Sequence, residues 1–223
     1  MPRPRPPYHH GDLRNALVSA AAQRVEEGGQ EQFSLRETAR SVGVTANAAY
    51  RHFADKSALL AAVAASGFEE LSRRMVAAMA RRGQTADDGN TATGRLRAVG
   101  RAYVELALER QELFRLMFSP SGLSCLDGGA SQILGPTPAE LLGEVLDDLV
   151  AEGRMSRERR VGAELRAWAA VHGFASLVID GRSGLQTKTH RADALVAMLD
   201  FIISGLCEGS SVTPRSSARR PRS

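Results

Sequence analysis

Residues 34–60 read SLRETARSVGVTANAAYRHFADKSALL, and this stretch decides the fold of the chain. Ser34 and Glu37 have the S-x-x-E spacing of a capping box, which predicts that a helix begins immediately after Ser34. Gly43 follows the apolar face of that helix, and a glycine can take the positive φ that a tight turn between helices needs. The stretch therefore begins with a capped helix that ends in a glycine turn.

The second half of the stretch predicts two further helices. Thr45 is placed to cap a helix over about 45–52, whose first turn has only small side chains, and Asp55 is placed to cap the next helix. Two short helices joined by a glycine-containing turn, with polar side chains on the second, are typical of a helix-turn-helix that enters the major groove of DNA. The alternative is a helical hairpin in an ordinary core, with these polar side chains merely solvated.

Residues 43–64, GVTANAAYRHFADKSALLAAVA, resemble the DNA-binding signature of the TetR family of bacterial transcriptional regulators. The resemblance extends closely over about residues 13–63, and residue type and spacing agree across three helices. It implies an all-α fold with an N-terminal three-helix helix-turn-helix domain and a larger C-terminal helical domain for ligand binding and dimerisation. Further along, LFRLMF at 113–118 and WAAVHGF at 168–174 resemble the regulatory half of a subgroup with a Trp…His-Gly motif.

The resemblance also implies which residues contact double-stranded DNA, as a palindromic operator. It implies base-edge contacts from Arg36, Thr45, Ala46, Asn47 and Arg51, and phosphate contacts from Ser34, Tyr50, His52 and Lys56. The chain departs from the commoner family pattern at Thr38 and over 46–49, where few side chains can donate hydrogen bonds. Specificity is therefore expected to draw on methyl contacts and DNA shape as well.

Composition and charge fit a soluble regulator located in the cytoplasm. The chain has 223 residues, 43% of them hydrophobic, and its formal net charge is +4. The positive charge lies at the two ends, because 57–208 contains more acidic than basic residues. No apolar run is long enough for a membrane span, no secretory signal is visible, and two cysteines cannot make a disulfide framework.

The helix pattern predicts four segments. They are a disordered basic arm over 1–11, a helix-turn-helix domain over 12–55, a regulatory and dimerisation domain over 56–208, and a disordered basic tail over 209–223. One unbroken helix is predicted from 56 to about 82, which would join the DNA-binding end to the regulatory half. A loop is predicted over 119–136, and a single helix from Ser156 to about Asp180.

The two C-terminal helices are apolar on more than one side, so each needs more partners than a small domain offers. We expect them to pair with the same helices of a second chain in a two-fold, four-helix interface. The predicted interface residues are Phe174, Val178, Leu195, Leu199, Ile202 and Leu206. The alternative is a helix at the centre of a monomeric bundle.

A small-molecule effector is expected to bind in the C-terminal domain. The candidate pocket residues mix aromatic bulk with a few polar tips, and they are Phe68, Tyr103, Phe114, Met117, Phe118, Trp168 and His172. Aromatic and Met side chains at helical spacing are also common in a plain core. His172 can equally be a neutral core histidine with a hydrogen-bond partner.

No enzyme motif, cofactor or metal site is predicted. The sequence has no glycine-rich phosphate loop and no Cys/His metal spacing, and a pairing of Cys125 with His172 or His190 carries little weight. The predicted function is a homodimeric DNA-binding repressor that a small molecule releases. The alternatives are an activator of the same fold and a helical module whose N-terminal helices dock a protein.

Overall fold

The computed structural model describes residues 10–81, 91–127 and 133–207, and every regular element in these ranges is a helix. The predicted all-α fold is therefore confirmed. The predicted arm and tail lie outside the described residues, apart from His10 and Gly11, which belong to the first helix. The elements are α1 (His10–Gly28), α2 (Leu35–Ser41), α3 (Ala46–Tyr50), α4 (Lys56–Ala80), α5 (Ala92–Glu109), α6 (Gln111–Met117), α7 (Pro120–Leu123), a 3₁₀ turn η1 (Ser124–Asp127), α8 (Pro138–Ala151), α9 (Arg157–Arg160), α10 (Ala163–Ile179) and α11 (Lys188–Leu206).

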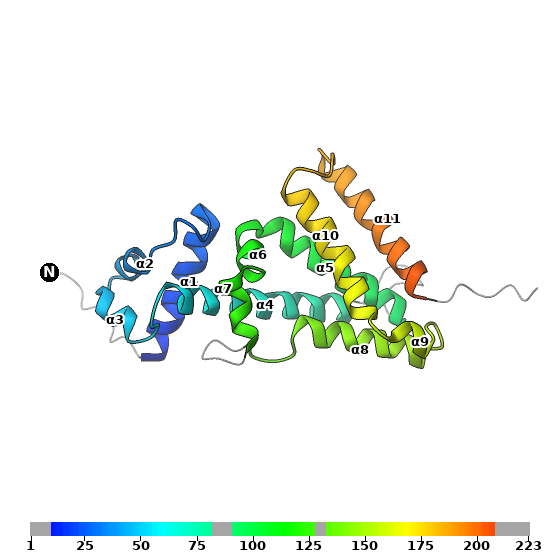
Figure 1. Ribbon diagram of the computed structural model, residues 1–223, viewed down its shortest axis with the longest axis horizontal. Helices are drawn as coiled ribbons and strands as arrows, with labels where there is room; N and C mark the ends of the chain where they lie inside the picture. The colour runs from blue at the N-terminus through cyan, green and yellow to red at the C-terminus, as the bar shows by residue number, and fades with distance from the viewer. Residues whose placement is uncertain (1–9, 82–90, 128–132, 208–223) are drawn as a thin grey trace, which may run out of the picture.

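α1, α2, α3 and the start of α4 form a small domain at one end of the molecule, which we call the head (Figure 1). Leu17, Ala21 and Val25 are fully buried and form the inward face of α1. Ala49 and Phe53 are also buried, so α3 packs one side into the head and leaves the other side outward.

α4 runs without a break from the head into the C-terminal helices, which we call the body (Figure 1). It packs against α5, α6, α7 and α8, and it buries Phe68, Leu71 and Met75 on its inward side. At 1.5 Å per residue, its 25 residues extend about 37 Å. A single helix therefore links the head to the centre of the body, as the spacing of apolar residues predicted.

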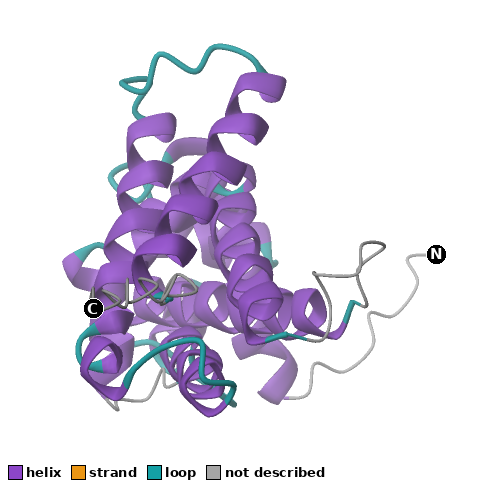
Figure 2. Ribbon diagram, turned by 90° about the vertical axis from the view of Figure 1, so that its right-hand side faces the viewer, coloured by secondary structure: helices purple, strands orange, loops and turns teal. Residues whose placement is uncertain are grey.

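α5 lies at the centre of the body, where it contacts α4, α6, α8, α10 and α11. α10 and α11 lie side by side and run in opposite directions, joined by a loop at one end (Figures 1 and 2). Each of these two helices therefore has one side against the body and another side facing outward.

The predicted loop over 119–136 is wrong in its first part, where the chain forms α7 and η1. Ser119 caps α7, because its Oγ accepts a hydrogen bond from the N–H of Gly122 at 3.1 Å. Pro120 occupies the first position of this helix, where its missing N–H costs nothing. A proline within the predicted loop therefore begins a helix.

The predicted single helix over 156–180 is also wrong, because it is broken into α9 and α10. Ser156 does cap α9, but Gly162 takes a φ of 68°, a left-handed conformation that stops the helical hydrogen bonding. Val161, directly before this glycine, is 76% exposed.

Within the three described ranges, every helix is too short or too polar to cross a lipid bilayer.

Candidate functional site

The turn between α2 and α3 has the geometry that the sequence predicted, with one difference. Ser34 Oγ accepts from the N–H of Glu37 at 3.5 Å, but the Glu37 carboxylate pairs with Arg24 of α1, 3.3 Å away, instead of completing the capping box. Gly43 has a φ of 78°, and its N–H donates to the carbonyl of Arg40 at 3.0 Å. α2 is therefore tied to α1 at its start and stopped by the glycine at its end.

α3 and α4 begin with the two predicted caps. Thr45 Oγ1 accepts from the N–H of Ala48 at 3.3 Å, and Asp55 Oδ1 accepts from the N–H of Ala58 at 2.8 Å. Because Ala49 is the buried residue of α3, the neighbouring positions of that helix point away from the core. The outward side of α3 is therefore free to enter a groove.

The nine predicted DNA-contacting residues lie on α2, α3, the turns beside α3 and the start of α4. Six are exposed and three are half-buried; the exposed residues are Arg36, Thr45, Asn47, Tyr50, Arg51 and Lys56, and the half-buried residues are Ser34, Ala46 and His52. Asn47 does not pack into its own chain, so the outward face carries an amide that can pair with a base edge.

Lys56 lies in the first turn of α4, at the positive end of the helix. Its Nζ donates to the carbonyl of Glu31 at 3.3 Å and lies 6.0 Å from the ring centroid of Phe33. These contacts hold an exposed ammonium next to the free N–H groups of a helix start, an arrangement that favours a phosphate oxygen.

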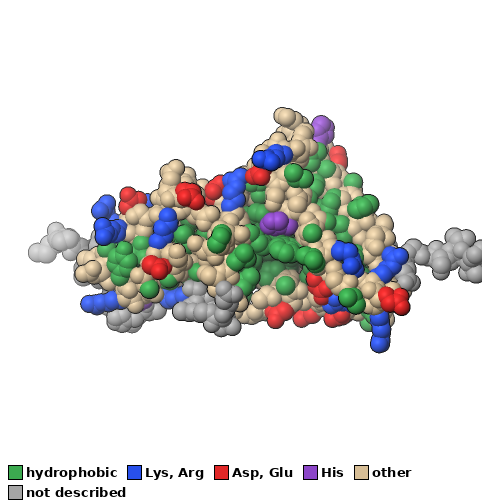
Figure 3. All heavy atoms as spheres, viewed as in Figure 1, with side chains coloured by type: hydrophobic (Ala, Val, Ile, Leu, Met, Phe, Trp, Pro, Cys, Tyr) green, Lys and Arg blue, Asp and Glu red, His purple; other side chains and the backbone are tan. Residues whose placement is uncertain are grey.

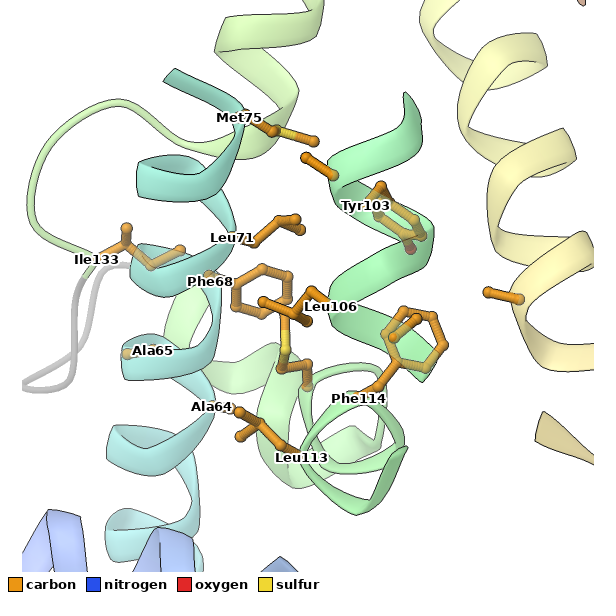
Figure 4. Packing of buried hydrophobic residues seen from close by; sticks show 14 of the residues in the cluster. Ala64, Ala65, Phe68, Leu71, Met75, Tyr103, Leu106, Leu113, Phe114 and Ile133 are labelled. Carbon is orange, nitrogen blue, oxygen red and sulfur yellow. The ribbon is translucent and has the colours of Figure 1, made fainter. Parts of the chain in front are cut away.

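A cavity of about 450 Å³ lies in the body, between α4, α5, α7, η1, α8, α10 and α11. An apolar hollow is visible on the face of the molecule shown in Figure 3. Figure 4 shows Phe68, Leu71 and Met75 of α4 pointing toward α5, which carries Tyr103. The volume is in the range of small-molecule sites.

Four of the seven predicted pocket residues line this cavity, and three do not. The lining residues are Phe68, Tyr103, Phe118 and Trp168, whereas Phe114, Met117 and His172 are outside the lining. Phe114 and Met117 are buried behind it, and the Phe118 ring lies 5.0 Å from the Phe114 ring and 4.7 Å from the His172 ring, centroid to centroid. Phe114 and His172 therefore support the lining through Phe118.

Sequence reasoning missed most of the aliphatic lining. The missed residues include Leu71, Met75, Leu96, Val99, Leu142, Leu165, Leu199, Ile202 and Ile203. Each reads as an ordinary core residue at helical spacing, so nothing in the sequence separates a lining side chain from a packed one.

A chain of hydrogen bonds joins three polar side chains beside the cavity. Trp168 Nε1 donates to Tyr103 Oη at 3.1 Å, and Tyr103 Oη lies 2.9 Å from His172 Nδ1. Burial raises the pKa of the Tyr103 hydroxyl far above its ordinary value, although the bond from Trp168 acts in the opposite direction. Burial also lowers the pKa of His172, so both groups are neutral at physiological pH.

Four of the six predicted dimer-interface residues are buried within a single chain, and they are Val178, Leu195, Leu199 and Leu206. Leu199 packs so closely on α5 that a Cβ at Gly100 would lie 2.6 Å from its Cδ2. Phe174 and Ile202 are half-buried. The sequence showed that both helices carry many apolar residues, but it could not show which side of each helix packs against the body.

A cluster of ion pairs connects the head to the body, and the sequence did not indicate it. Arg110 Nε lies 2.6 Å from Glu26 Oε1 of α1, and Arg110 Nη1 lies 3.0 Å from Glu70 Oε2 of α4. Arg74 bridges Glu70 at 2.7 Å and Glu109 at 2.6 Å. Arg110, between α5 and α6, therefore holds α1 and α4 together at the junction of the two domains.

The described residues contain no group of three His, Cys, Asp or Glu side chains that is placed to hold a metal ion. Cys125 and Cys207 are both buried and are not joined in a disulfide.

Two family models match the chain. The model of bacterial regulatory proteins of the TetR family matches residues 17–63, and the model of the tetracyclin repressor-like C-terminal domain matches residues 96–202. The second match includes the segments LFRLMF at 113–118 and WAAVHGF at 168–174. It does not identify the Trp…His-Gly subgroup, which stays a prediction. No curated protein matches the chain.

Solved structures have the same fold over nearly the whole chain. A protein of unknown function from Rhodococcus sp. RHA1 is 29% identical, with a TM-score of 0.72 over 92% of this chain and 100% of that chain. A TetR-family transcriptional regulator from Pectobacterium atrosepticum is 25% identical, with a TM-score of 0.64 over 90% of this chain and 96% of that chain.

A more distant structure shows the fold with a drug bound. It is a TetR variant from Acinetobacter baumannii AYE in complex with minocycline, 21% identical, with a TM-score of 0.58 over 89% of this chain and 96% of that chain. TetR-family regulators bind DNA and are not enzymes. The chain combines the N-terminal and C-terminal domains of the TetR family of transcriptional regulators, and it has the fold of that family.

Proposed function

We propose that this protein is a repressor that binds a palindromic operator as a homodimer and leaves it when a small molecule fills the cavity. The observation that carries the proposal is the outward face of α3, where Asn47 and Arg51 are exposed beside the positive start of α4. A helix of this kind reads base edges, while the cations and N–H groups around it contact phosphates. Such a regulator acts in the cytoplasm, where bacterial DNA lies.

The outer sides of α10 and α11 support a two-fold dimer. Phe201 is 80% exposed, and Leu177 and Val196 are exposed as well. A Cβ added at Gly173 would meet nothing within 4 Å, so the backbone of α10 is open to close approach by another helix. Paired about a two-fold axis, these sides would form a four-helix interface.

The cavity and the head share α4, which supports release by a ligand. Phe68, Leu71 and Met75 line the cavity, and the same helix begins at Lys56 in the head. A ligand that fits better when α4 is displaced would move the two heads of a dimer relative to each other. Palindromic DNA requires half-sites about 34–36 Å apart or a multiple, so the moved heads would no longer fit. Only differential affinity for the two arrangements drives this change.

The test is the selection of bound duplexes from a random DNA pool, followed by affinity measurements on the selected site and on random DNA. A palindromic consensus with two subunits bound supports the proposal. Asn47→Ala is expected to weaken binding to the selected site by about 1–3 kcal/mol and to leave random DNA unaffected. Ser41→Ala, at an exposed residue of α2 outside the predicted contacts, is the control. Failure to enrich any duplex would refute the DNA-binding role.

A further inference from the structure

We infer that the cavity binds an uncharged, largely apolar molecule and excludes anions and cations of the same size. This inference rests on the proposed function only in treating the cavity as the effector site. It follows from the charge and the hydrogen bonding of the lining side chains, which are considered in turn.

Among the described residues, no positively charged side chain lines the cavity, so an anion has no partner of opposite charge there. The lining contains no Lys, Arg or His, and it has one acidic residue, Glu164. An anionic ligand would therefore lose its hydration without gaining a partner, which strongly disfavours its binding. The aromatic and aliphatic side chains that make up the rest of the lining compensate for none of that loss.

The negative charge of Glu164 is already balanced by a neighbouring arginine, so this carboxylate offers little to a cation. Its Oε1 lies 2.5 Å from Arg160 Nη1, and Arg160 Nε lies 2.7 Å from Asp147 Oδ1. Hydrogen bonding from its own backbone N–H and the Arg160 pair lower the pKa of the Glu164 carboxyl. The carboxylate therefore stays ionised and stays paired, and a ligand cation would have to compete with Arg160 for it.

The neutral polar groups of the lining are also occupied. The Trp168 N–H donates to Tyr103 Oη, and that oxygen is also bonded to His172. Thr137 Oγ1 accepts from the N–H of Glu140 at 3.2 Å and lies 2.9 Å from its Oε2. The Tyr103 and Thr137 hydroxyl oxygens each keep one free lone pair, because an oxygen has two. These two hydroxyls therefore offer a ligand only acceptor sites, and no neutral side chain of the lining has an N–H or O–H left to donate.

The experiment compares two pairs of probes that differ in charge but not in ring size. N-phenyl-1-naphthylamine is neutral, and 1-anilinonaphthalene-8-sulfonate is the same skeleton with a sulfonate. Acridine is neutral at slightly alkaline pH, and N-methylacridinium carries a fixed positive charge. Fluorescence titration of the first pair and equilibrium dialysis of the second give four dissociation constants for the full-length protein.

We expect each neutral probe to bind about tenfold or more tightly than its charged counterpart. Ala139→Trp places bulk at an exposed lining position at the start of α8, and it should abolish neutral binding. Ala151→Trp, exposed at the other end of α8 and outside the lining, should leave it unchanged. The two variants separate binding in the cavity from binding elsewhere on the surface.

Two outcomes would overturn the inference. One is a charged probe that binds as tightly as its neutral counterpart and is lost in Ala139→Trp. The other is neutral binding that is absent from the wild type or insensitive to Ala139→Trp. Neither outcome would contradict the proposal that the protein binds DNA, because the affinity for the selected duplex is measured separately and without probe.

Discussion

We propose two different tasks for single side chains in this protein, contact with DNA and support of the cavity. Lys56 belongs to the first, because its ammonium is exposed at the start of α4 and anchored by the carbonyl of Glu31. His172 belongs to the second, because it closes the hydrogen-bond chain through Tyr103 and meets the Phe118 ring edge to face without lining the cavity itself.

Lys56→Ala is expected to weaken binding to selected and random DNA alike, because a phosphate contact carries no sequence information. The slope of log affinity against log salt should fall by about one, since one counterion fewer is released. Lys188→Ala is the matched control, since Lys188 is exposed at the start of α11 in the body and should change neither quantity. An unchanged slope in Lys56→Ala would remove this residue from the phosphate contacts.

The pKa of His172 predicts a loss of stability in acid. Burial lowers the pKa of the folded-state imidazole below its ordinary 6.5, so the unfolded chain binds the proton more readily. The stability that the folded protein gains from a neutral His172 is complete above about pH 6.5. It is lost as the pH falls through that value and toward the folded-state pKa. Urea denaturation at pH 7.5 and at pH 5.5 gives the free energy of unfolding at each pH. Between the two, this free energy should fall more in the wild type than in His172→Gln. Equal losses in the two proteins would contradict a buried, neutral His172.

At the scale of helices, the connection between head and body depends on α4 and on the cluster around Arg110. α4 gives the two domains a shared axis, and Arg110 joins α1 to α4 through Glu26 and Glu70. These groups are partly exposed, so each pair stabilises less than a fully buried one would.

Arg110→Ala is expected to lower the free energy of unfolding by about 1–2 kcal/mol, because it removes the ion pair of the half-buried Glu26 carboxylate and one of the two arginines that pair with Glu70. Arg115→Ala is the control: it also removes an arginine with two acidic partners, but that side chain is more exposed, and it should cost about 0.5 kcal/mol or less. Chemical denaturation measures both. Similar losses in the two variants would mean that the cluster is an ordinary surface feature.

At the scale of the whole molecule, the outer sides of α10 and α11 carry large apolar side chains that a single chain leaves exposed, among them Leu177, Val196 and Phe201. Phe201→Asp is expected to turn the proposed dimer into a species near 23.9 kDa in sedimentation, because it places a charge where two chains would pack. Leu134→Asp is the control, since Leu134 is equally exposed but precedes α8, and it should leave the dimer intact. A wild type that sediments as a single chain at micromolar concentration would exclude the interface altogether.

The sequence by itself determined the starts of α2, α3 and α4, the turn at Gly43 and the fold class, because each depends on residues within a few positions of one another. Ser34, Thr45 and Asp55 cap the helices that their positions predict, and Ala49 and Phe53 face inward as the 3.6-residue period requires. The residues expected to contact DNA lie together for the same reason, since one turn and two short helices carry nearly all of them.

Only the tertiary structure decided which apolar side chains pack, line the cavity or face outward. Leu199 and Phe201 are both apolar residues of α11, yet one packs against Gly100 of α5 and the other is 80% exposed. Arg110 meets Glu26, 84 positions away in the chain, and Trp168 meets Tyr103 across 65. The period of a helix shows that it has an apolar side, but where other helices lie around it depends on packing between distant segments.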